Sequence, residues 1–190
     1  FLGFILPVGY LLFLSLPAWA VMMGDRFVEH LWNSFSLAAL TSLLAMIFAL
    51  FLVYSARLRA GQLNTMFYRI VSLGYGFPGS VIAIGVLIPM AWLDYRIDDF
   101  MRNAFGISTG LIFTGGIAVV IFAYLVRFMA LGLHSLQSSM GSLTPNLDAA
   151  AQSLGANWRR RLSTVHIPLI TGGLLTGALL VFVDVMKELP

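Results

Sequence analysis

Long apolar stretches, each about the length of a membrane-crossing helix, constrain this chain more than any other feature. A helix needs about 20 mostly apolar residues to cross a hydrocarbon layer of roughly 30 Å. Five stretches meet or approach this length: 1–23, 35–54, 70–93, 107–126 and 169–185. Each is expected to be helical, because lipid offers backbone polar groups no partner outside the segment itself. The sequence therefore predicts an all-α, multi-span helical membrane protein with five transmembrane helices.

The composition supports this fold class. Apolar residues make up 59% of the chain and charged residues 10%, whereas soluble domains carry about 25% charged residues. Cysteine is absent from the 190 residues, which excludes disulfides and thiolate metal sites within them. The first stretch has no charged residues before it and no small-residue cleavage site, so it is expected to be a span rather than a signal peptide. We also expect the chain to be part of a longer polypeptide.

The arginines predict how the chain crosses the membrane. Basic residues gather in two alternate connections: Arg57, Arg59 and Arg69, then Arg127, Arg159, Arg160 and Arg161. Connections rich in arginine and lysine stay in the cytoplasm. The amino end is therefore expected to be cytoplasmic, and the charged residues at 187–190 are expected to emerge outside.

The third apolar stretch carries an unusual cluster of glycine and proline at Gly76, Pro78 and Gly79. Single glycines in such a stretch favour close packing between helices. A cluster of this kind instead favours a kinked or broken helix, whose freed backbone groups line a translocation path. We favour the broken helix for residues 76–79.

The segment 128–168 is too long for a simple turn between two helices, which usually takes about 2–8 residues. Thr144 can cap a helix with Pro145 at its first position. Gly155 can end that helix, and Asn157 can cap a second one. The sequence thus predicts two short helices joined by a glycine elbow, on the cytoplasmic side.

The first of these helices is expected to present a face of mostly small side chains. Leu147, Ala150, Ala151 and Leu154 recur at helical spacing. Such a face suits the groove of another protein. The alternative is a helix lying on anionic lipid headgroups, which Trp158 and the three arginines after it would favour.

This segment resembles the EAA loop of permease subunits from ABC importers, whose consensus is E-A-A, three residues, G, nine residues, I-x-L-P. The matched residues are Ala150, Ala151, Gly155, Val165, Ile167 and Pro168, with both spacings kept. The chain departs from the consensus at the acid, because Ala149 occupies the glutamate position and Asp148 precedes it.

Two further stretches, 76–94 and 181–190, are similar to the ferric-iron branch of that family. The resemblance implies that residues 1–190 are part of one permease transmembrane domain, in the second half of a two-half chain. It also implies an inner-membrane location, partner ATPase subunits docked on the EAA loop and a periplasmic solute-binding protein. ATP would be used by the partner, and we expect this chain to bind no cofactor and no nucleic acid.

No motif for nucleotide hydrolysis or other catalysis is present. A P-loop needs a glycine-rich run followed by lysine, and Lys187 is the one lysine of the chain. We therefore expect a permease subunit and not an enzyme. The isolated histidines His30, His134 and His166 are expected to have interfacial roles rather than to bind metal.

Charged residues near the ends of the apolar stretches are the remaining candidates. Asp184, Lys187 and Glu188 have helical spacing that allows them to pair, and with the 76–79 cluster they are candidates for a translocation path. Carboxylates between the third and fourth stretches are hard donors suited to ferric iron, although a solvated loop is the favoured explanation: Asp94, Asp98 and Asp99, with Tyr95 beside them. A secondary transporter or channel, or an importer of another solute such as thiamine or a polyamine, remains the alternative.

Overall fold

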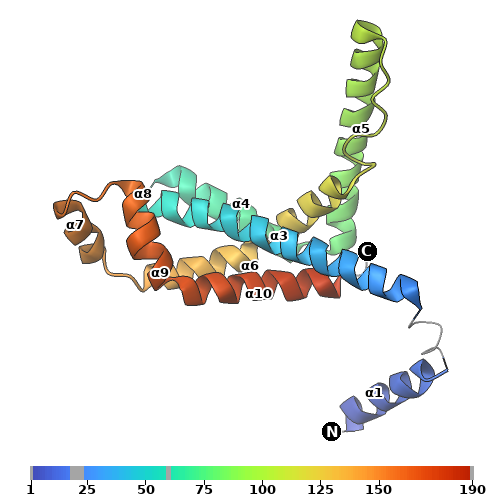
Figure 1. The fold of residues 1–190 in the computed structure, drawn as a ribbon, viewed down its shortest axis with the longest axis horizontal. Coiled ribbons are helices and arrows are strands. Elements are labelled where there is room, and N and C mark those ends of the chain that lie inside the picture. The colour runs from blue at the N-terminus through green and yellow to red at the C-terminus, as the bar shows by residue number, and fades with distance from the viewer. Residues whose placement is uncertain (1, 18–23, 59–60, 189–190) are drawn as a thin grey trace. The chain divides into compact units, whose positions relative to one another are not determined.

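The computed structural model describes residues 2–17, 24–58 and 61–188, which contain helices and no strand (Figure 1). The chain divides into two units, Phe1–Leu37 and Ala38–Pro190. The first unit holds α1 (Leu2–Ser15) and the start of α3 (Asp25–Leu58). The predicted first span therefore has a helix of 14 residues at its start, and its residues 18–23 lie outside the described part.

In the second unit, α6 (Ile117–Gly141) is the central helix. It packs against α4 (Gln62–Gly76), α5 (Gly79–Phe105) and α10 (Thr171–Lys187). Its buried side chains Phe128, Leu133 and Leu136 join two hydrophobic clusters with residues of α3 and α10. Burial of aliphatic and aromatic side chains against several helices at once makes α6 the element on which the others are assembled.

Small residues allow α6 and α10 to approach closely. The Ser135 hydroxyl donates to the Gly173 carbonyl oxygen at 2.8 Å. A Cβ on Gly177 would lie 3.2 Å from Cβ of Ser135. Ser42 of α3 donates to the Ala178 carbonyl oxygen at 2.7 Å. This pattern of glycine and back-bonding serine is typical of helix packing in membranes, where close backbone approach replaces the hydrophobic effect.

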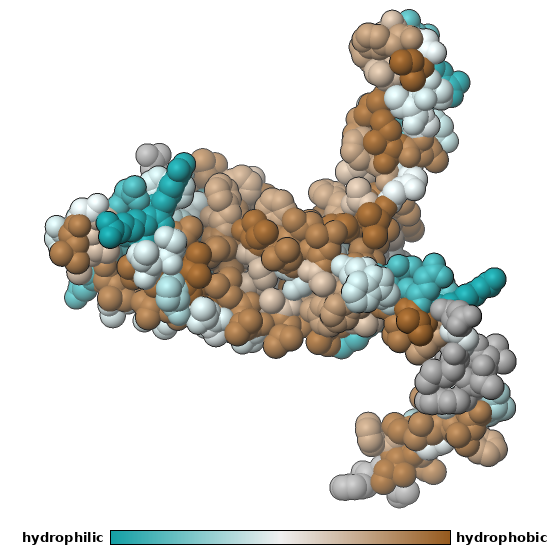
Figure 2. Space-filling model, in the orientation of Figure 1, coloured by the Kyte–Doolittle hydropathy of each residue, from teal (hydrophilic) through white to brown (hydrophobic). Residues whose placement is uncertain are grey.

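The outer surface of this unit is apolar. Figure 2 shows hydrophobic residues along the visible faces of α3 and α10 and hydrophilic residues at the end that carries the short helices after α6. The exposed apolar residues of the two long helices include Leu40, Leu43, Ile47, Phe48, Phe51, Leu175, Leu179, Leu180 and Val183. A soluble protein would bury these side chains, so the surface is that of a helical membrane protein.

The predicted third span is broken into two helices, α4 and α5, at Phe77 and Pro78. Proline disfavours helical geometry in the residue before it, and Phe77 is extended with φ −89° and ψ 142°. The Pro78 carbonyl oxygen then accepts from the backbone N–H groups of Val81 and Ile82, which starts α5. The break expected at residues 76–79 is confirmed, and the single span 70–93 is corrected to two helices.

The boundaries of the predicted fourth span are also wrong. Residues 107–116 are not α-helical, and α6 begins at Ile117 and continues to Gly141. Hydropathy alone placed the span too early, because the 107–116 segment is apolar but contains three glycine residues and turns. Arg127, which was expected in the cytoplasmic connection, therefore lies inside a helix.

The carboxylates expected in a solvated outer loop lie on α5 instead and fasten the 107–116 segment to it. Asp94 is fully buried. It accepts from the backbone N–H groups of Ile112, Phe113 and Thr114 at 2.8–3.0 Å. Asp98 accepts from the backbone N–H groups of residues 109 and 110. The loop assignment was wrong because charged residues lower the mean hydropathy of a helix, and hydropathy does not show that their hydrogen-bond partners lie at 109–114.

Four short elements connect α6 to α10: α7 (Pro145–Ser153), α8 (Trp158–Arg161), the π-helix η1 (Leu162–His166) and α9 (Ile167–Leu169). The Ile167 N–H donates to the Leu162 carbonyl oxygen, in the wider hydrogen-bonding pattern of a π-turn. The helices on either side of Ile170 are bent by 74°. The connection proper is therefore shorter than the predicted 128–168, because α6 occupies its first part.

Three helices of the described residues are long and apolar enough to cross a membrane: α3 from Arg26, α5 and α6. The bent pair that ends in α10 makes a fourth if it counts as one span. Helix α4 has 15 residues and is about 22 Å long, shorter than the hydrocarbon layer. The all-α membrane fold is thus borne out, whereas the five-span count is not.

Candidate functional site

The short helices between α6 and α10 form the first region of interest, here named the α7–α9 segment (residues 145–169). Pro145 occupies the first turn of α7, as the sequence predicts. Gly155 has φ +77°, a left-handed conformation that glycine adopts without steric cost. The Asn157 side chain caps α8 by accepting from the Arg160 N–H at 2.9 Å. Two helices joined by a glycine elbow are therefore present.

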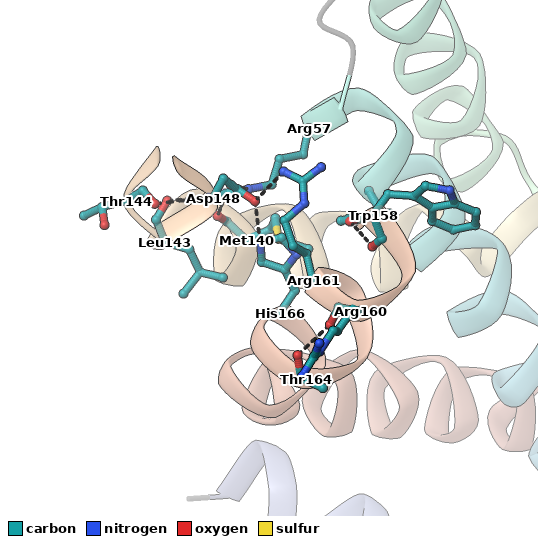
Figure 3. A network of polar contacts seen from close by, with 11 residues as sticks. Arg57, Met140, Leu143, Thr144, Asp148, Trp158, Arg160, Arg161, Thr164 and His166 are labelled. Atoms are coloured by element: carbon teal, nitrogen blue, oxygen red, sulfur yellow. Dashed lines mark hydrogen bonds and ion pairs between the residues drawn. The ribbon is translucent and has the colours of Figure 1, made fainter. Parts of the chain in front are cut away.

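One arginine of α3 holds this segment in place. Arg57 donates through Nε to Asp148 Oδ2 at 2.8 Å and through Nη1 to the Met140 carbonyl oxygen at 2.8 Å. Its Nη2 donates to the carbonyl oxygens of Leu143 and Thr144. The guanidinium thus joins the end of α3 to the end of α6 and to α7 (Figure 3). A planar fork of five donors is suited to this task.

Asp148 is the acid at the centre of the same network. Its Oδ1 lies 3.0 Å from His166 Nε2 and 3.6 Å from Arg161 Nη1. His166 is fully buried. Arg57, Asp148, Arg161 and His166 are referred to below as the Arg57 network (Figure 3). The carboxylate points into this chain, so it stabilises the segment on the membrane helices.

A second tether reaches the segment from α3. The Tyr54 hydroxyl donates to the Trp158 carbonyl oxygen at 2.6 Å. The Tyr54 ring also meets the His166 ring edge-on, with centroids 5.4 Å apart. Tyr54 therefore contacts the start of α8 and the end of η1, and Arg57, one helical turn away on α3, holds α7.

The residues that match the EAA consensus divide into exposed and buried sets. Ala149, Ala150, Gly155 and Pro168 are exposed, whereas Ala151 is buried and Val165 and Ile167 are half-buried. On the face predicted for docking, Leu154 is 84% exposed. The segment therefore presents an open strip of small and aliphatic side chains along α7 and the elbow.

A cavity of about 450 Å³ lies between α5 and α6. None of the residues of the Arg57 network lines it. Its lining is mostly apolar, from Ile82, Val86 and Val119 among others. The polar residues of the lining are Ser80, Tyr124, Arg127 and Glu188, and it is referred to below as the Arg127 cavity.

An ion pair lies in the lining of this cavity. Arg127 Nη2 lies 2.8 Å from Glu188 Oε1, and the two side chains are 23% and 31% exposed. The guanidinium also lies over the Phe128 ring, with Cζ 5.2 Å from the centroid. Its Nη1 occupies the space where a Cβ on Gly79 would stand. Gly79 and Glu188, both candidates for a translocation path, are thus brought together by Arg127.

The other candidates are placed separately. Asp184 and Lys187 pair with each other at 2.8 Å on the outside of α10, as their spacing predicted. Gly76 ends α4, and Pro78 lies in the break between α4 and α5. Among the described residues, no group of three or more histidines, aspartates or glutamates is arranged to hold a metal ion.

Sequence reasoning missed the two arginines that organise these regions. Arg57 was used only to orient the membrane crossing. Arg127 was assigned to a loop, which placed it on the opposite side of the membrane from Glu188, and the 2.8 Å pair corrects that placement. The apolar run continues on both sides of Arg127. A single charge within such a run could have identified it as a residue at membrane depth.

Two characterised proteins are similar to this chain. The Fe(3+)-transport system permease protein FbpB 2 of Haemophilus influenzae is 28% identical over 168 residues, which cover 87% of this chain and 30% of that protein. The Molybdenum transport system permease protein ModB of the same organism is 27% identical over 158 residues, covering 82% of this chain and 66% of ModB. No family model matches the chain.

The chain therefore spans about a third of the first relative and just under two thirds of the second. The similarity confirms the resemblance to inner-membrane permeases of ABC importers, including the iron branch.

Proposed function

We propose that this chain is part of the membrane permease of an ATP-driven ABC importer, with the α7–α9 segment as the docking site of the partner ATPase. The observation that carries the proposal is the open small-residue strip of α7, held rigidly against α3 and α6 by the Arg57 network. A docking element must transmit force, and one fastened by an ion pair and three carbonyl hydrogen bonds can do so.

In this mechanism, closure of the ATPase pushes on α7 and the elbow at Gly155. Because Arg57 ties α7 to the ends of α3 and α6, the push reaches the membrane helices rather than bending the segment. The helices then exchange between outward- and inward-facing arrangements, and the ATPase supplies the free energy that biases this exchange.

For the cargo, we favour ferric iron, delivered by a periplasmic solute-binding protein. Similarity to FbpB 2 supports this choice, and similarity to ModB makes a molybdenum species the main alternative. Metal accumulation in cells that express the whole transporter separates the two, with an ATPase variant unable to hydrolyse ATP as control. Accumulation of neither metal would reject both cargoes.

The docking role is tested by overpacking the strip. Ala150→Trp should reduce co-purification of the ATPase about tenfold or more, because the exposed Ala150 would no longer fit a groove. Ala104→Trp, on an exposed site of α5, is the matched control and should leave co-purification unchanged. Ala150 is preferable to Ala151, whose side chain packs within this chain.

Binding of the segment to lipid headgroups makes the opposite prediction. In that case Arg159→Gln with Arg160→Gln should weaken function most, at about 1 kcal/mol of surface attraction per arginine. Ala150→Trp would then be tolerated, and undiminished ATPase binding by this variant would reject the docking role.

A further inference from the structure

The Arg127 cavity joins three parts of the sequence that lie far apart. Gly79 and Ser80 come from the start of α5, Tyr124 and Arg127 from α6, and Glu188 follows the end of α10. Its volume of about 450 Å³ falls within the range of small-molecule sites, roughly 300–1,000 Å³. Mostly apolar walls with a few convergent polar groups are typical of such sites.

The charges of the cavity favour an anion over a bare cation. Arg127 is the one cationic side chain of the lining, and Glu188 the one acid, among the described residues. A hard multivalent cation requires several oxygen ligands from the protein, and one carboxylate already paired with arginine does not provide them. A guanidinium fork, by contrast, is suited to carboxylate and oxyanion groups.

Gly79 supports this role of Arg127. The absence of a side chain at Gly79 leaves the space that Nη1 of Arg127 occupies beside the start of α5. The guanidinium thus lies beside Gly79 and over the Phe128 ring. It keeps donors beyond those that a single Glu188 oxygen can accept.

We propose that the Arg127 cavity binds the cargo through anionic oxygens, with Arg127 as the binding residue and Glu188 as the carboxylate that the cargo displaces. The inference rests on the proposed permease function, and it specifies the chemical form of the cargo. That form is either an oxyanion or a ferric ion that carries its own carboxylate ligands, and the two share the oxygen chemistry that Arg127 recognises.

Displacement of Glu188 would also open the cavity on one side. Glu188 follows the last turn of α10, where its N–H donates to the carbonyl oxygens of Asp184 and Val185. Once its side chain leaves Arg127, the end of α10 loses its ion pair to α6. Cargo binding would therefore break the ion pair between the end of α10 and Arg127, which lies within α6.

The experiment is equilibrium dialysis of the whole purified transporter against radiolabelled molybdate and, separately, ferric citrate. Glu188→Gln should raise the affinity for one of the two probes about tenfold, because Arg127 is no longer occupied. Arg127→Gln should lower it by a similar factor. Arg96→Gln, an exposed arginine of α5, is the control and should change neither.

A charge exchange separates binding from structure. The double variant Arg127→Glu with Glu188→Arg keeps an ion pair between α6 and α10, so the fold should survive, but it moves the cation out of its place beside Gly79. It should bind the probe as weakly as Arg127→Gln. Wild-type affinity in the exchanged variant, or unchanged affinity for both probes in Glu188→Gln, would overturn the proposal.

Failure of the proposed importer function and failure of the Arg127 proposal would give different results. If no ATPase co-purifies with the transporter, the importer assignment is wrong, whereas dialysis still reports whether Arg127 binds an anion. Thermal unfolding of each variant is the control that separates a loss of binding from a loss of fold.

Discussion

Two arginines each pair with an acid of a distant segment, and they differ in how many of their donors the chain uses. Arg57 makes four hydrogen bonds, to Asp148 and to the carbonyl oxygens of residues 140, 143 and 144. Arg127 has an ion pair to Glu188 and a ring contact with Phe128 among its described interactions. Four of the five donors of the first guanidinium are used within its own protein, whereas Glu188 is the one ion-pair partner of the second among the described residues.

The difference indicates different roles for the same chemistry. The hydrogen bonds of Arg57 to three carbonyl oxygens hold the end of α6 and the start of α7 against α3, which makes a fixed joint. An arginine with spare donors beside a cavity can exchange its partner for a ligand. Arg57 is therefore expected to matter for stability, and Arg127 for binding.

The largest expected effect concerns the side of the membrane on which each region lies. The 190 residues contain no cysteine, so a thiol introduced into them is unique there. Ser153→Cys near the Arg57 network should react with an impermeant maleimide only from the cytoplasm, and Lys187→Cys near the Arg127 cavity only from outside. Reaction of both from one side would break the comparison, because the two regions would then share a membrane face.

The next effect is on stability. Arg57→Met should lower the free energy of unfolding by about 2–3 kcal/mol, somewhat less than the cost of breaking a fully buried pair, since its side chain is 16% exposed. Arg127→Met should cost about 1 kcal/mol or less, as for a more exposed ion pair. Thermal unfolding in detergent measures both, and equal losses would contradict the assignment of a structural role to Arg57 alone.

A smaller effect is expected at the elbow. Gly155→Ala should cost about 1–2 kcal/mol because φ +77° places alanine in left-handed geometry. Gly141→Ala, an exposed glycine with open space around its Cα and no positive φ, is the control. The measurement is the rate of proteolytic cleavage within residues 145–169. Equal rates in the two variants would show that the backbone at residue 155 accommodates alanine without strain.

The smallest effect sharpens the comparison at Arg127. Gly79→Ala should displace the guanidinium and so reduce the coupling energy between Arg127 and Glu188, expected to be about 0.5–1 kcal/mol, to near zero. A double-mutant cycle with Arg127→Met and Glu188→Gln measures it in each background. An unchanged coupling energy would show that Arg127 still pairs with Glu188 when residue 79 carries a methyl group.

The features set by local chemistry could be predicted from sequence. Pro78 and its neighbours predicted the break between α4 and α5, because proline acts on the residue before it. Pro145, Gly155 and Asn157 predicted the two short helices, since caps and left-handed turns depend on one or two side chains. The all-α membrane fold followed from apolar runs alone.

The features that depend on distant partners could not be predicted. Asp94 looked like a loop residue, because its partners at 112–114 belong to a segment that hydropathy assigns to a helix. Arg127 looked like the end of a span, because its acid lies 61 residues further along the chain. Charges on membrane helices are the residues for which hydropathy is least informative, and here they define both regions.

The continuity of α6 has a mechanical consequence. Arg127 and Met140 lie on one unbroken helix, about 20 Å apart along its axis. Because the helix is continuous between them, these two residues keep a fixed orientation relative to each other about its axis. One residue inserted between them would turn one end by about 100° relative to the other. Arg57 could still donate to the carbonyl oxygens at the end of α6, but Arg127 would face away from Gly79. The number of residues between the two regions is therefore as important for their function as the identity of the residues.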